Sequence, residues 1–457
     1  MPNYKFNALL QSEGWLSPAY VRTDNKGKII SLASQPDEGI QHENVNGFAL
    51  PGFQNAHSHA FQYAMAGIAE KHKAETDDFW SWRETMYKIA LTLDPDQLEK
   101  VATMLYAEMA RHGYTHVAEF HYLHHDKKGK PYANVAEMGQ RLIQAAKNAG
   151  IKITLVPMFY QTGGFGMSPQ PHQRRFISKT ISEYTLLFEK IKEATKNYSG
   201  ANYGAGIHSL RAATPNDIIT VLEQLEENIP IHIHIAEQLK EIADAKAFLG
   251  ARPVEWLLKN ANVNSNYHLV HATHLTDNEV EGIANSGAHV VLCPTTEGNL
   301  GDGLFPLQNY QKVGGKWSIG TDSHISINPL EELRLLDYGQ RLTTHSRNIY
   351  QGEGNLGGGA YAFRQSLLSG RKAMNNLQTT YFEVGHALDA VIYDADYPLF
   401  ATSSLENLID TIVYCGDASS NLGTLVDGKW MVKNGKHVNQ SKLRTDFKET
   451  MKALDVR

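Results

Sequence analysis

The stretch Leu50-Pro-Gly-Phe-Gln-Asn-Ala-His-Ser-His-Ala60 indicates a short buried strand that runs directly into two histidines, His57 and His59. Alternate residues of an extended chain lie on the same side, so both imidazoles can point at one ion from the end of one strand. The pair alone is weak evidence, because the chain has 21 histidines and many such pairs lie on surfaces by chance. The prediction of a metal site therefore depends on the residues at the ends of the other strands.

Eight β-type runs alternate with helical or loop segments through the middle of the chain. Asp94-Pro95, Asn134 and Thr214-Pro215 are typical helix starts, and Gly113 and Gly150 are typical helix ends. An eight-fold alternation of this kind predicts an α/β protein with a closed (β/α)8 TIM-like barrel rather than an open sheet. The runs are the strand before His57, followed by Thr115–Phe120, Ile151–Val156, Tyr203–Ile207, Ile231–Ile235, Tyr267–Val270, His289–Leu292 and Trp317–Gly320.

Both ends of the chain also carry short β-type runs. We expect residues 1–48 and 380–440 to form one small β-sandwich domain, residues 49–379 the barrel, and residues 441–457 a C-terminal helix. The C-terminal runs are Ala387–Tyr393, Thr411–Tyr414 and Gly423–Val438, the last with Asp427-Gly428 and Asn434-Gly435 as hairpin turns. The glycine-rich run Gly352–Gly359 has no strand before it, which indicates a loop and not a nucleotide-binding turn.

The composition excludes several classes of partner. With 43 lysines and arginines against 49 acidic residues, the net charge is −6, and no basic run suggests a nucleic acid or an anionic membrane surface. The first residues lack the apolar core of a signal peptide, and no window is apolar enough for a membrane span. Two cysteines cannot form a disulfide framework, so a reducing cytoplasm is expected.

Polar side chains lie in and just after strand five, which has the sequence Ile231-His-Ile-His-Ile-Ala-Glu237. In a barrel of this kind, catalytic groups lie at the C-terminal ends of the strands. His232 is expected to be an interior barrel residue with a hydrogen-bond partner, whereas His234, nearer the rim, is the candidate ligand. Glu237 lies just past the strand, where a carboxylate beside a cation can both accept and donate a proton.

Strands six and eight add two more polar groups. His271 is at the tip of strand six, whereas His274, just past it, is the candidate for a structural role. Asp322 comes after strand eight, and the competing interpretation of a helix cap is weaker because Asn328 before Pro329 is the better cap. Three imidazoles and one carboxylate suit zinc with an open position for water, and zinc lowers the pKa of that water to about 7.

The joint pattern resembles the amidohydrolase superfamily, in its one-metal deaminase branch, over nearly the whole chain. The residues that carry the resemblance are His57-x-His59, His234-x-x-Glu237, His271 and Asp322. The end of strand four, Gly206-Ile-His-Ser-Leu-Arg211, lacks the bridging lysine of the two-metal branch, which favours one metal. The resemblance implies one zinc held by His57, His59, His234 and Asp322, proton handling by Glu237, His271 and Asp322, and a homodimer. The C-terminal β region, Phe382-Glu-Val-Gly-His-Ala-Leu-Asp-Ala390, departs from the sequence that is usual in the family. This region belongs to the small domain, which carries no chemistry.

Within that branch, several stretches resemble deiminases that act on a formimidoyl derivative of a dicarboxylic amino acid. They are His57-Ser-His-Ala-Phe-Gln62, Phe79-Trp-Ser-Trp-Arg-Glu84, Glu119-Phe-His-Tyr-Leu-His-His125 and His208-Ser-Leu-Arg211. Arginine binds carboxylates through two parallel hydrogen bonds, and Tyr, His and Gln can add further ones. The expected substrate-binding residues are Gln62, Arg83, Tyr122, His208 and Arg211. For Arg83, a surface ion pair with Glu84 is the alternative.

The expected reaction is the zinc-dependent hydrolytic deimination of N-formimidoyl-L-glutamate to N-formyl-L-glutamate and ammonia, a step of histidine degradation. The enzymatic alternative is a one-metal deaminase or chlorohydrolase of an aromatic heterocycle such as a purine, whose pocket would not need two arginines. A non-catalytic scaffold is the alternative from a different class, but it would have no reason to keep all six metal and proton groups. The expected partner is therefore a small dicarboxylate substrate.

Overall fold

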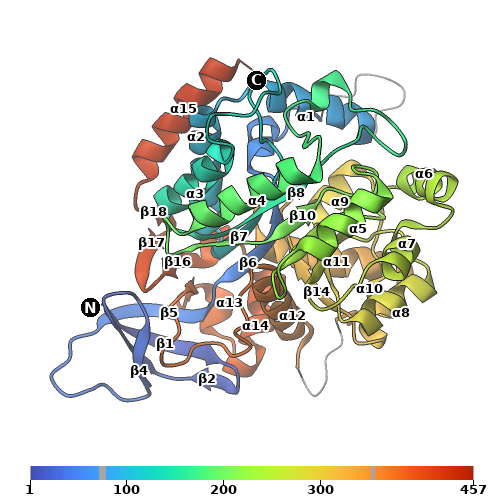
Figure 1. Cartoon of the computed structure of the whole chain (residues 1–457). Helices are drawn as coiled ribbons and strands as arrows, with labels where there is room; N and C mark the ends of the chain where they lie inside the picture. Colours follow the sequence, from blue (N-terminus) through green and yellow to red (C-terminus); the bar gives the residue numbers. More distant parts are fainter. Residues whose placement is uncertain (1, 71–78, 351–355, 456–457) are drawn as a thin grey trace.

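The structure is a computed structural model that describes residues 2–70, 79–350 and 356–455. Residues 352–355 of the predicted glycine-rich loop and residues 456–457 of the predicted terminal helix lie outside this part. Within it, the named strands form two sheets, a parallel barrel and a second sheet of mixed direction (Figure 1). The predicted fold class is confirmed.

The barrel strands succeed one another around the sheet in chain order, so each βα unit places its strand beside the previous one. Backbone contacts close the ring, because the amide of His59 donates to the carbonyl of Asp322 and the amide of Asp322 donates to the carbonyl of His57. A short strand, β9 (Ala201–Tyr203), pairs with β8 just before β10. The barrel strands are β6 (Phe53–Ser58), β7 (Tyr114–His121), β8 (Lys152–Phe159), β10 (Ala205–Ile207), β11 (Ile231–Ile235), β12 (Tyr267–His271), β13 (His289–Leu292) and β14 (Lys316–Ile319).

Helices cover the outside of the barrel, and three of them begin at predicted caps. The Asp94 side chain caps α2 and the Thr214 side chain caps α5, each with proline at the first helical position. Asn328 caps α11, as predicted. The helices are α1 (Phe79–Thr92), α2 (Pro95–Arg111), α3 (Glu137–Ala149), α4 (Ile181–Thr195), α5 (Pro215–Gln224), α6 (Leu239–Leu249), α7 (Pro253–Asn260), α8 (Asp277–Ser286), α9 (Pro294–Leu300), α10 (Leu307–Lys312), α11 (Pro329–Thr344) and α12 (Gly358–Ala373), with short 3-10 turns η1 (Ala60–Met65) and η2 (Pro171–Gln173).

The second sheet joins both ends of the chain. Its order is β18-β17-β16-β15-β5-β1-β3-β4, with β2 paired to β1. The predicted hairpin turns are confirmed, since Asp427, Gly428, Asn434 and Gly435 all have positive φ between paired strands. The strands are β1 (Asn3–Gln11), β2 (Gly14–Leu16), β3 (Ala19–Thr23), β4 (Ile29–Ala33), β5 (Glu43–Pro51), β15 (Ala390–Asp394), β16 (Asn421–Val426), β17 (Lys429–Lys433) and β18 (Lys436–His437).

One predicted strand is wrong. Thr411–Tyr414 lies in helix α14 (Leu405–Cys415), whose buried residues are Leu408, Ile409, Ile412 and Val413. That spacing places them on one helical face, and a four-residue apolar run cannot reveal it. The short helix α13 (Pro398–Ala401) precedes it, η3 (Ala418–Ser420) comes after it, and the C-terminal helix α15 (Gln440–Leu454) packs on α2 (Figure 1).

The two sheets are continuous through the stretch from Leu50 to Ala60. Strand β5 ends at Pro51 in the second sheet, and β6 begins at Phe53 in the barrel, with Gly52 between them. All six residues of β6 are buried, as expected for a parallel strand covered on both faces. No described helix is both long enough and apolar enough to cross a membrane.

Candidate active site

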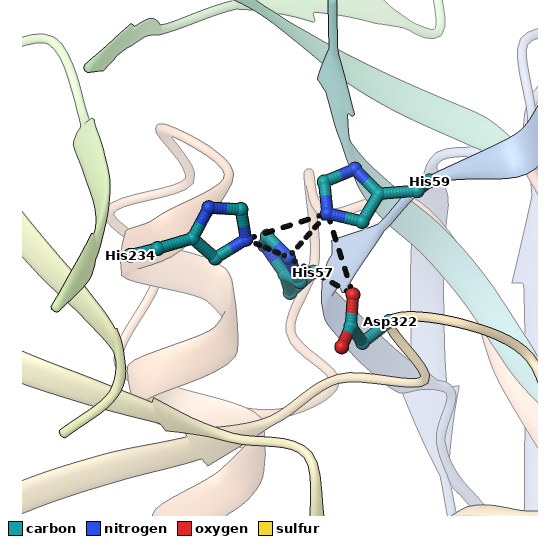
Figure 2. A group of neighbouring side chains, drawn as sticks. All are labelled: His57, His59, His234 and Asp322. Carbon is teal, nitrogen blue, oxygen red and sulfur yellow. Dashed lines mark hydrogen bonds and ion pairs between the residues drawn. The ribbon is translucent and has the colours of Figure 1, made fainter. Parts of the chain in front are cut away.

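Four side chains converge at the C-terminal mouth of the barrel (Figure 2). The Nε2 atoms of His57, His59 and His234 lie 3.1–3.3 Å from one another. Asp322 Oδ1 lies 3.4 Å from the first of these atoms and 3.3 Å from the second. All four residues are buried. The structure thus brings together the four residues that the sequence predicts as metal ligands, and we call these four side chains the metal group.

Hydrogen bonds of the other ring nitrogens fix the tautomers of two histidines. His59 Nδ1 donates to the carbonyl of Phe120 at 2.8 Å, and His234 Nδ1 donates to the carbonyl of His208 at 2.9 Å. Because the proton is on Nδ1, each Nε2 presents a lone pair toward the others. Burial also lowers the pKa of the His57 imidazole to about 3 and that of His234 well below its usual range, which keeps both rings neutral.

This donor set fits a zinc ion. Zinc–nitrogen bonds of about 2.0–2.1 Å place tetrahedral ligand atoms roughly 3.3 Å apart. The measured spacings of 3.1–3.4 Å match that value. Although burial would raise the pKa of Asp322, contacts with the neighbouring histidines hold it below its usual range, so the carboxylate is ionised. Lone pairs this close repel one another unless a cation lies between them.

The backbone turns sharply where these groups leave their strands. Ala236, His271, Ala272 and Asp322 have φ of 54°, 68°, 49° and 43°, in the left-handed region that residues other than glycine seldom adopt. Such strain persists where the surrounding structure holds it in place, and it is concentrated at functional sites. Here it directs successive side chains from the strand ends into one cavity.

Two buried acids hold neighbours of the metal group in place: Glu119 holds the end of β6, and Glu297 holds His271. Glu119 on β7 accepts hydrogen bonds at 2.6 Å from the Ser58 hydroxyl and from the Ala60 amide, which holds the end of β6 in place. Burial raises the pKa of Glu119 to about 8. Sequence reasoning gave Glu119 no role of its own, although it begins one of the stretches that resemble the deiminases.

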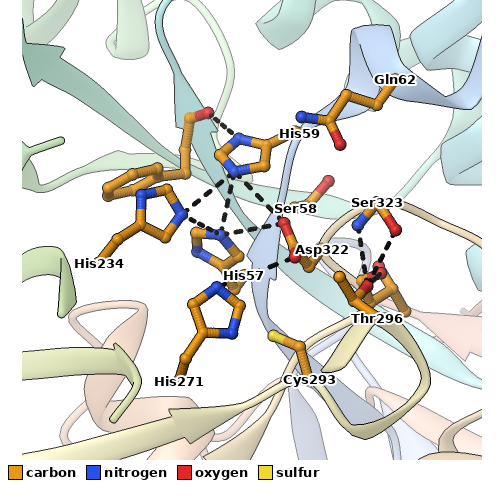
Figure 3. A network of polar contacts seen from close by, with 12 residues as sticks. His57, Ser58, His59, Gln62, His234, His271, Cys293, Thr296, Asp322 and Ser323 are labelled. Atoms are coloured by element: carbon orange, nitrogen blue, oxygen red, sulfur yellow. Dashed lines mark hydrogen bonds and ion pairs between the residues drawn. The ribbon is translucent and has the colours of Figure 1, made fainter. Parts of the chain in front are cut away.

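The second acid, Glu297 on α9, was missed by sequence reasoning. Its Oε1 lies 3.2 Å from His271 Nδ1 and accepts the Cys293 amide at 2.9 Å. It lies just past strand seven, and the rule that strand ends carry chemistry could have identified it. Cys293 itself is a buried free thiol beside His271 (Figure 3). The sequence favours a small buried apolar role for both cysteines, and this is wrong for Cys415, which is exposed.

Glu237 and His271 lie next to the metal group, as predicted. His271 Nε2 is 3.7 Å from Glu237 Oε1 and 4.0 Å from Asp322 Oδ2. Burial alone would lower the pKa of His271, but Glu237, Glu297 and Asp322 raise it to about 10. Burial raises the pKa of Glu237, against the opposing charges of His271 and Arg211. The pair can therefore hold and exchange a proton beside the metal group.

The predicted substrate-binding residues share a cavity with the metal group. The cavity has a volume of about 50 Å³, and its lining includes Gln62, Arg83, Tyr122, His208, Arg211, His59, His234, Glu237, His271 and Asp322. Gln62 Nε2 donates to the Tyr122 hydroxyl at 2.9 Å, which leaves the hydroxyl hydrogen free for a ligand. The side chains of residues 79–81, which begin another of the stretches that resemble the deiminases, lie outside the described part.

The two arginines differ in their surroundings. Arg211 Nη1 lies 3.3 Å from Glu241 Oε2, and its Nη2 lies 3.9 Å from Glu237 Oε2. Its Nε is buried without a hydrogen-bond partner among the described residues. Arg83 on α1 donates to the Tyr160 hydroxyl at 3.3 Å and lies over the ring of Tyr87. Sequence reasoning missed this aromatic support for Arg83.

The two histidines expected to be structural lie outside the metal group. His232 is buried, and its Nε2 donates to the carbonyl of Ala373 at 2.9 Å, as expected of an interior barrel residue. His274 is half-buried and belongs to none of the clusters that could hold a metal in the described part. Geometry therefore separates both from the ligands.

The model of the amidohydrolase family matches residues 48–431. The chain belongs to this family. It is 39% identical to formimidoylglutamate deiminase of Pseudomonas aeruginosa over 97% of this chain and 98% of that protein. It is also 23% identical to 5-methylthioadenosine/S-adenosylhomocysteine deaminase of Halobacterium salinarum, over 93% of this chain and 91% of that protein. The prediction of a hydrolase that acts on a C–N bond is confirmed.

Solved structures agree with this assignment. An amidohydrolase from Brucella melitensis superposes with a TM-score of 0.93 at 38% identity, covering 99% of this chain and 100% of that one. An adenosine deaminase from Xanthomonas campestris with bound zinc superposes with a TM-score of 0.80 at 19% identity, covering 100% and 98%. The second likeness shows the fold alone.

Proposed function

We propose that the protein hydrolyses N-formimidoyl-L-glutamate to N-formyl-L-glutamate and ammonia, with one zinc ion per chain. The observation that carries this proposal is one cavity lined both by three of the four predicted metal ligands and by two arginines, Arg83 and Arg211. A formimidoyl group at the metal end and carboxylates at the arginine end match this division. The similarity to formimidoylglutamate deiminase of Pseudomonas aeruginosa supports the same substrate.

His57, His59, His234 and Asp322 would hold the zinc ion. When bound, zinc lowers the pKa of a water ligand to about 7 and so supplies hydroxide at neutral pH. The carbonyls of Phe120 and His208 keep two of the imidazoles in the ligating tautomer. The protein's own contribution is a pre-arranged donor set of neutral imidazoles and one ionised carboxylate at the base of the cavity.

Glu237 and His271 would move the protons of the reaction. The attacking water loses a proton to the Glu237 carboxylate as the formimidoyl carbon becomes tetrahedral. Glu237 passes that proton to the amidine nitrogen, the remaining hydroxyl proton of the former water follows by the same route as the C=O bond forms, and the C–N bond breaks to release ammonia. His271, anchored by Glu297, keeps its Nε2 toward Glu237 and Asp322 and stabilises the negative charge there.

The rest of the substrate would be bound by Arg211, Arg83, Tyr122, Gln62 and His208. The unpartnered Nε–H of Arg211 and the free hydroxyl hydrogen of Tyr122 are donors that a carboxylate can satisfy. Gln62 Oε1 is also buried without a partner among the described residues, so it can accept a substrate N–H. Buried polar atoms of this kind are costly unless a ligand completes them.

Ammonia release from a panel of compounds tests the proposal. The panel contains formimidoylglutamate, formimidoyl compounds that lack one carboxylate, and purine and pyrimidine amines. We expect turnover of formimidoylglutamate far above the rest, together with one zinc per chain by elemental analysis of undialysed protein. Faster turnover of a purine would replace this proposal with the heterocycle deaminase. Two tightly held ions per chain would contradict the single-zinc part.

The proposal also includes a homodimer, which the resemblance implies, and a cytoplasmic location, which two cysteines that cannot form a disulfide framework suggest. Analytical ultracentrifugation of the purified chain measures the oligomeric state, and a monomer at micromolar concentration would contradict it. Localisation is tested by fractionation of the cells that make the protein. Neither result alters the proposed chemistry, because every proposed catalytic and substrate-binding residue comes from one chain.

A further inference from the structure

A second cluster of ligating groups lies beside the metal group, where the ring of His271 stacks on that of His234 with centroids 5.5 Å apart. Glu237, His271 and Asp302 each place one nitrogen or oxygen so that the three atoms lie within 4.8 Å of one another. The first two come from the ends of β11 and β12, and Asp302 comes from the loop after α9. All three side chains are buried. In Figure 3, His271 lies beside the metal group with one ring edge toward Asp322.

Asp302 takes no part in the proposed reaction, and its carboxyl group is only partly satisfied. One oxygen accepts a hydrogen bond from Gln238 Nε2. The other, Oδ2, is buried without a partner among the described residues, and the residue as a whole is 5% exposed. Burial and the nearby Glu237 raise the pKa of Asp302 to about 9, against the opposing charge of His271.

We propose that Glu237, His271 and Asp302 form a second, weaker site for a divalent zinc ion, and that zinc bound there inhibits the enzyme. The inference rests on the proposed function only for the roles of Glu237 and His271. One imidazole and two carboxylates suit zinc better than magnesium, which prefers oxygen ligands and near-octahedral geometry. The 3.7 Å between His271 Nε2 and Glu237 Oε1 is close to the ligand spacing that zinc requires.

Occupation of this site removes both proton carriers at once. A cation bound to Glu237 and His271 takes the carboxylate lone pair that would accept the proton from water and holds His271 away from its role, so turnover stops while the first ion stays in place. The site is weaker than the four-ligand site for two reasons. It has three protein donors instead of four, and the Arg211 guanidinium lies 3.9 Å from Glu237 Oε2, where it opposes a second cation.

The test uses the intact enzyme loaded with one zinc per chain and adds zinc chloride. Isothermal titration without substrate should show one further, weaker equivalent per chain, and the deiminase rate should fall over the same concentration range. A mild chelator that leaves the first ion in place should restore the rate. Magnesium chloride at the same concentrations should do neither.

Three variants locate the added ion. Asp302→Asn keeps an acceptor for Gln238 but loses the charge, so it should weaken the added equivalent by about tenfold or more, since even outer partners of ligands matter by that factor. Gln238→Leu removes the same hydrogen bond and keeps the carboxylate, so it should still bind the added ion. Cys293→Ser alters the neighbouring cluster of His271, Cys293 and Glu297 and should also keep the added ion. Each rate is normalised to the same protein without added zinc.

Two results would overturn the inference. One is the absence of both a further zinc equivalent and inhibition in the parent protein up to about 1 mM free zinc. This concentration is far above the dissociation constants typical of zinc sites in proteins. The other is an added equivalent that Asp302→Asn leaves unchanged or that Cys293→Ser abolishes. The titration needs no substrate, so a wrong substrate assignment would change the rate assay and leave the binding result intact.

Discussion

At the residue scale, Glu237 is the proposed proton carrier and is not one of the four predicted metal ligands. Its Oε1 faces His271 Nε2 at 3.7 Å, and its side chain is buried. Glu237→Gln preserves the shape but cannot carry a proton. We expect kcat for ammonia release to fall by roughly 10²–10⁴-fold. Zinc content by elemental analysis should stay at the parent value, and activity within a few-fold of the parent would show that another group moves the proton.

Arg211 carries the prediction on substrate choice. Breaking a charge-assisted carboxylate contact at a binding site costs about 2–5 kcal/mol. Arg211→Met should therefore lower kcat/KM for formimidoylglutamate by roughly 30- to 5,000-fold. The zinc should remain, because Arg211 is not a ligand. Formimidoyl compounds that lack the bound carboxylate should react about equally slowly with both proteins.

The structure adds a necessary control to this experiment. Arg211→Met leaves the buried Glu241 carboxylate without the cation at 3.3 Å, which lowers stability regardless of substrate. Arg211→Met combined with Glu241→Gln removes that stranded charge. The double variant should regain the parent's thermal stability but not its preference for formimidoylglutamate. If the preference returned as well, Arg211 would be a structural residue and the heterocycle alternative would gain support.

Residue types at strand ends could be predicted, whereas contacts between neighbours could not. The histidines and Asp322 lie in or just after apolar runs, so their placement depends only on strand register and barrel topology. Glu297, by contrast, meets His271 through a short helix, and Arg83 meets Tyr160 across a loop. Such contacts depend on the path of the chain between elements, which local periodicity does not encode.

At the scale of elements, Arg175 holds the helix that carries Arg83. Its fully buried guanidinium donates to the carbonyl of Ala90, in the last turn of α1, and to that of Leu93, just past the end of the helix, at 2.7 Å. Carbonyls at the C-terminal end of a helix lack partners within the helix, and a cation there interacts favourably with the negative end of the helix dipole. Arg175→Met should lower the free energy of unfolding by about 2–4 kcal/mol, because buried carbonyls lose charged partners.

The neighbouring Arg174 is the matched control. It donates to the carbonyls of Lys127 and Pro171 near the surface, so Arg174→Met should change stability by only about 0.5 kcal/mol. The apparent Tm at one fixed scan rate compares the two, and KM for formimidoylglutamate reports the position of Arg83. A Tm change of equal size in both variants would mean that α1 does not depend on Arg175.

Periodicity predicted the barrel elements well and failed where a segment was short. Each barrel strand lies within a few residues of its predicted run, because buried parallel strands are apolar and bounded by helix caps. Thr411–Tyr414 was too short for its helical period to be recognised, although Leu408 and Ile409 continue the same face. Helix α3 begins at Glu137 and not beside Asn134, whose side chain instead accepts a hydrogen bond from the Ala136 amide.

At the scale of the whole molecule, one lysine joins the barrel to the second sheet. Lys152, the first residue of β8, lies 2.5 Å from Asp389 Oδ2 and 2.8 Å from Asp427 Oδ1. Asp389 precedes β15, and Asp427 is in the turn between β16 and β17. The second sheet also supplies β5, which continues through Gly52 into β6 and its two predicted metal ligands. Loosening one sheet should therefore disturb the other.

Lys152→Met tests this coupling. The three side chains are 18–37% exposed, so the loss should be about 1–3 kcal/mol, between the values for surface and buried pairs. At 25 °C, kcat/KM should stay within about twofold, because Lys152 is at the end of the barrel opposite the site. On heating, zinc release and loss of the fold should shift together to lower temperature. Adding Asp389→Asn should restore part of the loss by removing the repulsion between the two carboxylates, and Lys190→Met, which breaks an exposed pair with Glu193, should change nothing. Zinc release at the parent temperature, with only the second sheet unfolding earlier, would show that the two sheets unfold independently.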